Sequence, residues 1–119
     1  MSEVVVVVAG GKRWALPTAR VREVAQLSAL TPVPTAPPPV VGLTQLRGQI
    51  VPVLDLAPDG GGEDARAPRP GDALVVVELG PVRAALWVER VLGVESDPAG
   101  VEPLDVGALF DDLRKRVNP

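Results

Sequence analysis

Few side chains in this sequence are of the types that carry out enzymatic chemistry. The chain contains no histidine and no cysteine, so the commonest general base, the commonest metal ligand and the thiolate nucleophile are all missing. No serine lies in a nucleophile-elbow pattern. The run Gly60-Gly61-Gly62 lacks the lysine and hydroxyl residue that follow the glycines of a phosphate-binding loop. These patterns exclude serine-hydrolase, zinc-hydrolase and phosphate-loop chemistry.

Pairs of carboxylates are the remaining candidates for catalysis. Asp111-Asp112 is expected on a solvated helix face and Glu63-Asp64 in a flexible loop, so both pairs are interpreted as ordinary surface charges. A catalytic acid or base would need a shifted pKa in a cleft, and no pair is placed to suggest one. We therefore predict no catalytic residue, no metal site and no cofactor, and expect that the protein is not an enzyme.

Arg47 is the charged residue whose position most suggests binding. It lies beside Gly48 between two strongly apolar segments, where its side chain must face outward or find a partner. From the residues alone, an exposed turn arginine and a functional one are equally good interpretations. Glu23 is interpreted as a solvated glutamate, and Trp14 and Trp87 as core residues rather than binding hot spots.

Composition limits the size of the fold and the classes of partner. A chain of 119 residues fits one folding unit, and with 46% hydrophobic but only 3% aromatic residues its core must be built from Val, Leu and Ala. The net charge of -3 leaves no basic excess for a phosphate backbone, so nucleic acid is not an expected partner. Residues 4–9 are too short for a signal-peptide core, and no stretch approaches membrane-spanning length. We expect a cytoplasmic protein without membrane insertion.

The elements that position these residues are predicted to be mostly strands joined by hairpins. Residues 4–9 and 12–16 flank a Gly-Gly turn, residues 40–47 and 49–56 meet at Gly48, and residues 73–79 and 82–88 flank Gly80-Pro81. A further strand over residues 91–95 brings the number to seven. Such a pattern favours an antiparallel or barrel architecture.

Two helices and two connecting segments complete the predicted organisation. Thr18 is expected to cap a short helix in which Val21, Val24 and Ala25 share a face. Asp105 is expected to cap a terminal helix whose apolar stripe comprises Val106, Leu109, Phe110, Leu113 and Val117. Prolines make residues 31–39 a stiff extended connector, and residues 57–72 are predicted to be a flexible loop.

The order of these segments resembles that of a known family. Residues 42–56, GLTQLRGQIVPVLDL, resemble the G-x-x-N-L-R-G-x-I-x-P-V-x-D-L stretch of the CheW family, the adaptors that couple chemoreceptors to the CheA kinase. Residues 14–17 and 19–24 resemble the family's second strand and its V-x-E-I helix, and residues 74–80 and 84–94 resemble strands that end in V-D-x-V-x-x-V. Gln45 replaces the asparagine and Glu89 the aspartate.

The resemblance implies a mainly β fold of CheW-like (SH3-like) small β-barrels, with a short internal helix and a C-terminal helix, in a single domain over residues 1–119. Family members usually carry a further strand pair before the final strand and helix, where only residues 95–102 intervene here. One barrel is therefore expected to be incomplete, as in shortened, FrzB-type members of gliding-motility chemosensory systems.

The function implied by the resemblance is that of a non-catalytic adaptor. Such an adaptor binds the cytoplasmic signalling tip of a methyl-accepting chemoreceptor and modulates its coupling to a CheA-type histidine kinase. Binding to the kinase or to a full-length CheW is expected to be weak or lost, and an open strand edge favours self-association. Motif position assigns receptor contact to Val21, Glu23, Val24, Arg47, Val88, Val91 and Val94.

Two alternative functions compete with this one, a small-ligand-binding β-barrel module and a degenerate enzyme, and the second would need the titratable group in a cleft that no carboxylate pair suggests. A ligand barrel would need a closed pocket with convergent polar groups, and the sequence offers few polar residues at positions expected to be buried.

Overall fold

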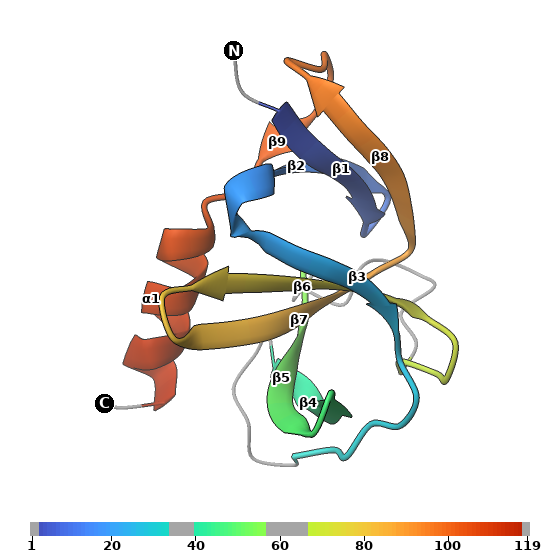
Figure 1. Cartoon of the computed structure of the whole chain (residues 1–119), viewed down its shortest axis with the longest axis vertical. Coiled ribbons are helices and arrows are strands. Elements are labelled where there is room, and N and C mark those ends of the chain that lie inside the picture. The colour runs from blue at the N-terminus through green and yellow to red at the C-terminus, as the bar shows by residue number, and fades with distance from the viewer. Residues whose placement is uncertain (1–2, 34–39, 57–66, 118–119) are drawn as a thin grey trace.

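The computed structural model describes residues 3–33, 40–56 and 67–117, with side chains described as far as residue 111. This part of the chain contains nine strands, a 3-10 turn η1 (Thr18–Arg20) and a helix α1 (Val106–Val117). The strands form two sheets, one of four strands in the order β8-β1-β2-β9 and one of five in the order β3-β6-β7-β5-β4 (Figure 1). The strands are β1 (Glu3–Ala9), β2 (Lys12–Pro17), β3 (Val21–Gln26), β4 (Val40–Leu46), β5 (Gln49–Asp55), β6 (Ala73–Leu79), β7 (Val82–Val88), β8 (Arg90–Ser96) and β9 (Glu102–Pro103).

The three predicted hairpins and the strand after them are confirmed as β1–β2, β4–β5, β6–β7 and β8. Two pairs of strands are parallel, β2 with β9 and β5 with β7. The sequence pattern, which consists of antiparallel hairpins, did not predict these pairs. Strand β1 explains the unbroken valine run, because every residue from Val5 to Ala9 is buried. A strand covered on both faces has no polar positions to alternate with its apolar ones.

The principal core lies between the two sheets and beneath α1. Its residues include Val7 and Leu16 from the four-stranded sheet, Val75 and Leu86 from the five-stranded sheet, and Phe110 from the helix. A second cluster of Leu27, Val51, Val53, Leu74 and Ala85 packs the other side of the five-stranded sheet. Branched aliphatic side chains thus do most of the packing, as the composition predicts.

The two tryptophans are partly buried and pack against the core clusters rather than lying within them. Trp14 packs against the principal core and donates from Nε1 to the carbonyl of Ala9 at 3.1 Å. Trp87 packs against the second cluster and donates from Nε1 to Oδ2 of Asp72 at 3.0 Å.

The predicted short internal helix is wrong, because the 3-10 turn leads directly into β3. Register pairs Val21 with Val77, Glu23 with Val76 and Val24 with Val75, which leaves Arg22 as an extra residue in a β-bulge. In an unbroken strand, residues three apart point to opposite faces, but the bulge returns Val21 and Val24 to the same face. The i, i+3 spacing that suggested a helix is therefore the signature of a bulged strand.

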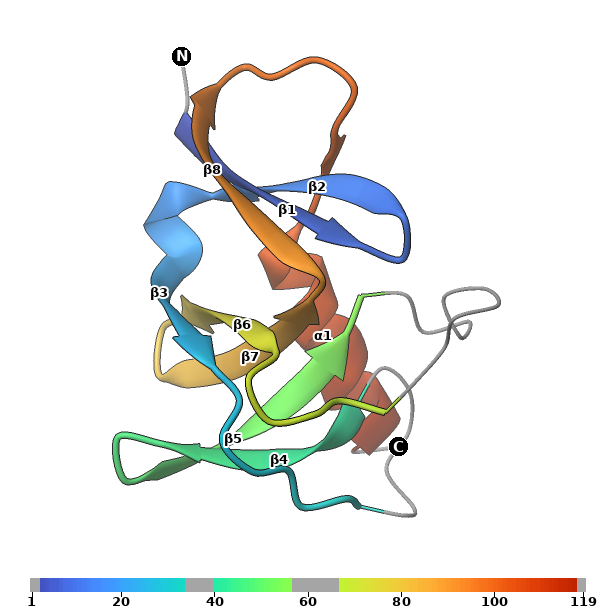
Figure 2. The same ribbon diagram turned by 90° about the vertical axis from the view of Figure 1, so that its right-hand side faces the viewer.

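The four-stranded sheet is the incomplete one. Its end strands β8 and β9 pair only with β1 and β2, and residues 97–101 connect them directly (Figure 2). The described chain has nine strands rather than the predicted seven, because the segment read as a helix is β3 and residues 102–103 form β9. The sheet stays open between its two ends.

The C-terminal helix is confirmed. Asp105 caps it, since its Oδ1 accepts a hydrogen bond from the Ala108 N–H at 3.0 Å, and Val106 and Phe110 are buried. The side chains of Leu113 and Val117 lie outside the described part, as do most of the proline connector, at residues 34–39, and most of the predicted loop, at residues 57–66. Neither the connector nor the loop prediction is tested there. Within the described residues no helix is long and apolar enough to cross a membrane.

Candidate functional site

Arg47 occupies the first of the two residues that link β4 to β5. Its φ is +49° and that of Gly48 is +80°, so both residues of this two-residue turn are left-handed. A turn of this type favours asparagine or glycine at the first position, because a larger side chain there is strained. An arginine kept in a disfavoured backbone conformation suggests a role for the side chain itself.

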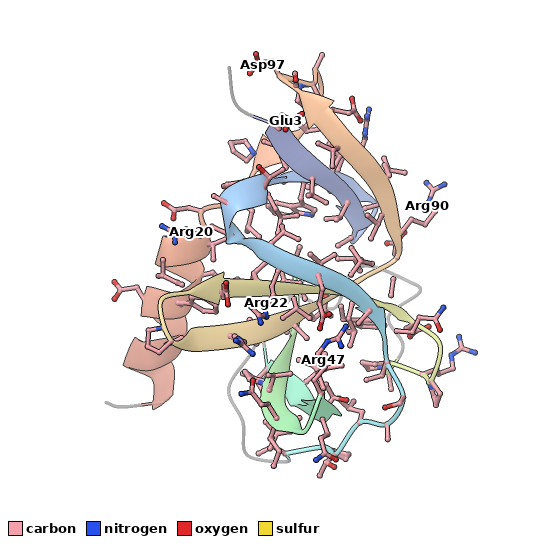
Figure 3. All side chains as sticks on the ribbon, in the orientation of Figure 1. Glu3, Arg20, Arg22, Arg47, Arg90 and Asp97 are labelled. Carbon is pink, nitrogen blue, oxygen red and sulfur yellow. The ribbon has the colours of Figure 1, made fainter. Side chains whose placement is uncertain are left out.

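The Arg47 side chain is paired with Glu23 of β3. Its Nη2 lies 2.8 Å from Glu23 Oε2, and its Nε donates to Oε2 at 3.0 Å and to Oε1 at 3.2 Å. Figure 3 shows the side chain directed toward β3. The Arg47 side chain is held in place by this pairing yet is 79% exposed, so it stays accessible to a partner.

The ion pair perturbs both of its groups. Hydrogen bonding from Arg47 is the largest cause that lowers the pKa of Glu23 below its ordinary value of 4.5; partial burial opposes it, and the charges of Arg47, Arg22 and Arg83 reinforce it. The same hydrogen bonding raises the pKa of Arg47. Both side chains are therefore charged at neutral pH, and the site presents a fixed polar anchor.

A second group of charged side chains lies next to this pair on the five-stranded sheet. Glu78 Oε2 lies 3.5 Å from Arg22 Nη1 and 3.3 Å from Arg83 Nε. Arg83 also donates from Nη1 to Gln49 Oε1 at 2.6 Å. Neighbouring strands β3, β6, β7 and β5 are thus tied together around the turn that carries Arg47.

Strand β8 contains a bulge like that of β3. Val94 lies opposite Val5 and Val91 opposite Val7, with Leu92 as the extra residue between them. Because Val5 and Val7 point into the core between the sheets, Val91 and Val94 lie on that same face. Both V-x-x-V motifs, in β3 and in β8, therefore use a bulge to direct two valines toward the space between the sheets.

These four valines, Val21, Val24, Val91 and Val94, form what we call the valine surface. Strands β3 and β8 are end strands of their sheets, and both views place them on the same side of the molecule (Figures 1 and 2). Val21 and Val91 pack against the core, while Val24 and Val94 are 54% and 58% exposed. Glu23 precedes Val24 in the same bulge, but it lies opposite Val76, so its side chain leaves the other face of β3 from Val21 and Val24.

Six of the seven residues assigned to receptor contact lie, partly buried or exposed, on β3, on β8 and in the β4–β5 turn, and hydrogen bonds join Arg47 to Glu23. The exception is Val88, which is 3% exposed in the principal core and so lies beneath the surface. The sequence interpretation missed Ile50, which is 71% exposed next to the Arg47-Gly48 turn, and Val82, exposed beside the β6–β7 turn. In the sequence, a β-branched apolar residue next to a hairpin turn could have indicated these two exposed positions.

A surface pocket lies between the β4–β5 turn and the β6–β7 turn. It is lined by Gln49, Ile50, Val51, Gly80, Pro81 and Arg83.

Fold and surface together define a class of protein, a small two-sheet β module with an exposed apolar strip and a charged anchor. The sequence profile of the CheW-like domain matches residues 3–111, and the chain belongs to this family.

Two known proteins illustrate the relationship. Protein FrzA of Myxococcus xanthus is 34% identical over 99 residues, which make up 82% of this chain and 61% of FrzA. The crystal structure of the scaffolding protein TtCheW from Thermoanaerobacter tengcongensis superimposes with a TM-score of 0.67 at 27% identity, over 85% of this chain and 66% of TtCheW. The chain thus spans less than two thirds of either protein. The relation to the Frz proteins is confirmed, whereas assignment to the FrzB type stays a prediction.

Proposed function

We propose that this protein is a non-catalytic adaptor of a chemosensory system, and that it binds the cytoplasmic signalling tip of a methyl-accepting chemoreceptor. The observation that carries the proposal is Arg47, which is held in a left-handed turn and paired with Glu23 of β3, the strand that also carries Val21 and Val24 of the valine surface. An exposed ion pair contributes little to stability and the turn would be easier with glycine, so recognition is the better explanation for this arginine. TtCheW, its structural relative, is a scaffolding protein.

The chemistry of the surface suits an amphipathic helical partner. Helices dock through rows of apolar side chains, and interfaces combine an apolar centre with polar groups at the rim. The valine surface supplies the apolar contact, and the exposed Arg47 side chain can donate to a carboxylate or carbonyl of the partner. A receptor tip, which the family resemblance implies is a helical hairpin, fits this combination.

The ligand-barrel alternative has less support. The cluster beside the five-stranded sheet consists of close-packed aliphatic side chains, and the one buried polar side chain of the described residues, Thr44, is satisfied by donating to the Ala29 carbonyl at 2.7 Å. A ligand site would instead converge several polar groups on an enclosed space. The pocket near Ile50 lies at the surface between two turns, where it could extend a protein interface.

Titration calorimetry with a receptor signalling fragment tests the proposal. Arg47→Glu should weaken binding by about tenfold or more, as expected for a hot-spot residue. Arg47→Asn should also weaken binding, although asparagine suits the left-handed turn and should keep the fold intact. The matched control is Arg13→Glu, because Arg13 lies opposite Val8, on the face of β1 away from the valine surface. Unchanged receptor affinity in both Arg47 variants would refute the assignment.

A further inference from the structure

The outer edge of β8 has backbone groups without a partner in the described part of the chain. Strand β8 ends the four-stranded sheet and pairs only with β1, although it is seven residues long. Two of its side chains, Leu92 and Val94, are exposed large apolar residues. An exposed strand edge of this length is a template for pairing with another chain.

Because of its bulge, β8 presents a pattern of side chains that is complementary to the same strand of a second copy running antiparallel to it. Arg90 lies opposite Val8 and Glu95 opposite Val4, so both charges lie on the same face of the sheet. Val91 and Val94 lie on the other face. In a regular strand without a bulge, Arg90 and Glu95 would point to opposite faces, because they are five positions apart.

Antiparallel pairing of two β8 edges about a two-fold axis through the bulges makes use of this pattern. Arg90 then faces Glu95 of a second copy, and Val91 faces Val94, each contact occurring twice by symmetry. Both strands carry their extra residue at the same place, so the register stays continuous across the bulges. Opposite charges and branched apolar residues are favourable cross-strand pairs.

Neither charge is used within the described part of the protein. Arg90 and Glu95 are exposed, form no ion pair there, and Arg90 points away from the molecule in Figure 3. We propose that a second copy of this chain pairs with β8 through the Arg90–Glu95 and Val91–Val94 contacts. The two four-stranded sheets then become one continuous sheet of eight strands.

Sedimentation velocity of the full chain, at concentrations from about 10 μM to about 1 mM, tests the proposal. The wild-type protein should form a dimer that weakens with added salt, because the charge pairs lie at the surface. Arg90→Glu and Glu95→Arg should each weaken self-association by about tenfold or more, since each places like charges opposite one another twice. Arg20→Glu, which reverses an exposed charge on η1, is the matched control and should leave the dimer intact.

Mixing the two variants provides the decisive measurement. An Arg90→Glu chain carries two glutamates on this face and a Glu95→Arg chain carries two arginines, so an equimolar mixture should dimerise although neither variant does so alone. The double variant R90E/E95R should recover the wild-type affinity. A monomeric wild-type protein, self-association that persists in both single variants, or a mixture that stays monomeric would each overturn the proposal. Circular dichroism and melting of each variant verify the fold.

Discussion

Arg47 combines properties that seldom coincide in one surface residue, namely a left-handed backbone, hydrogen bonds to both oxygens of a carboxylate and a mostly exposed side chain. The residues alone left open whether Arg47 is an exposed turn arginine or a functional one, and the family resemblance assigned it to receptor contact. The sequence could not indicate Glu23 as the partner, since 24 residues separate the two and only the packing of β3 beside the β4–β5 turn joins them. The interpretation of Glu23 as an ordinary solvated glutamate is wrong, because its carboxylate accepts hydrogen bonds from Arg47 and its side chain is 23% exposed.

Stability should decrease in acid through Glu23. Its pKa is lowered in the folded protein, so above pH 4.5 the carboxylate is charged in both states and its contribution is complete. As the pH falls below that value, the unfolded chain takes up the proton first, and the contribution is lost on the way down to the folded pKa. The difference in unfolding free energy between wild type and Glu23→Gln should therefore shrink from about pH 7 to about pH 3.

Urea denaturation of both proteins across this range measures the effect. Glu3→Gln is a suitable control, because Glu3 is exposed, makes no ion pair within the described residues and should change stability little. If the difference between wild type and Glu23→Gln stayed constant with pH, the ion pair would not be linked to folding.

The spacing of apolar residues led to a wrong prediction of a helix at β3 but to a correct prediction of a strand at β8. Both carry a V-x-x-V motif on a bulge, but Gly93 within the second motif argues against a helix, whereas Val21-Arg22-Glu23-Val24 contains only residues that a helix tolerates. Bulges depend on pairing with a neighbour, which local sequence does not encode. The hairpins were predictable because glycine and proline mark their turns and their partners are adjacent in the chain.

The C-terminal helix should be required for stability, because it closes the principal core. Phe110→Ala should cost about 3–5 kcal/mol by leaving a cavity between the sheets, and deletion of residues 109–119 should cause aggregation or unfolding. Ala108→Ser, at an exposed position of the same helix, serves as the control. Thermal melting with light scattering distinguishes the outcomes, and a truncated protein with an unchanged melting temperature would show that the helix is dispensable.

At the scale of the whole molecule, the open four-stranded sheet separates this protein from a complete two-barrel architecture. The family resemblance correctly indicated that one barrel would be incomplete, but not which one. Long-range pairings decide that point: the parallel contacts of β2 with β9 and of β5 with β7 leave β8 and β9 as the ends that never meet. The valine surface and Arg47 lie on segments that are present, so the proposed receptor site does not depend on closure of the four-stranded sheet.

This separation predicts that receptor binding and kinase coupling can be measured apart. Docking of one CheW-like domain on another needs a continuous patch of roughly 800 Å² on each partner with a well-packed centre. The strands absent after β8 would belong to the framework of such a patch, so we expect weak or no binding to a CheA-type kinase while receptor binding persists. The protein would then compete with a full-length CheW at the receptor.

Calorimetry against separate receptor and kinase fragments tests this prediction directly. Grafting a family-length hairpin between Pro98 and Gly100, in the segment that joins β8 to β9, should complete the sheet and restore kinase affinity. A flexible polar insert of equal length at the same position is the control, because it adds residues without adding strands and should leave kinase binding weak. Tight kinase binding by the unmodified chain would mean that the four-stranded sheet suffices and that its open end has another use, such as the self-pairing of β8.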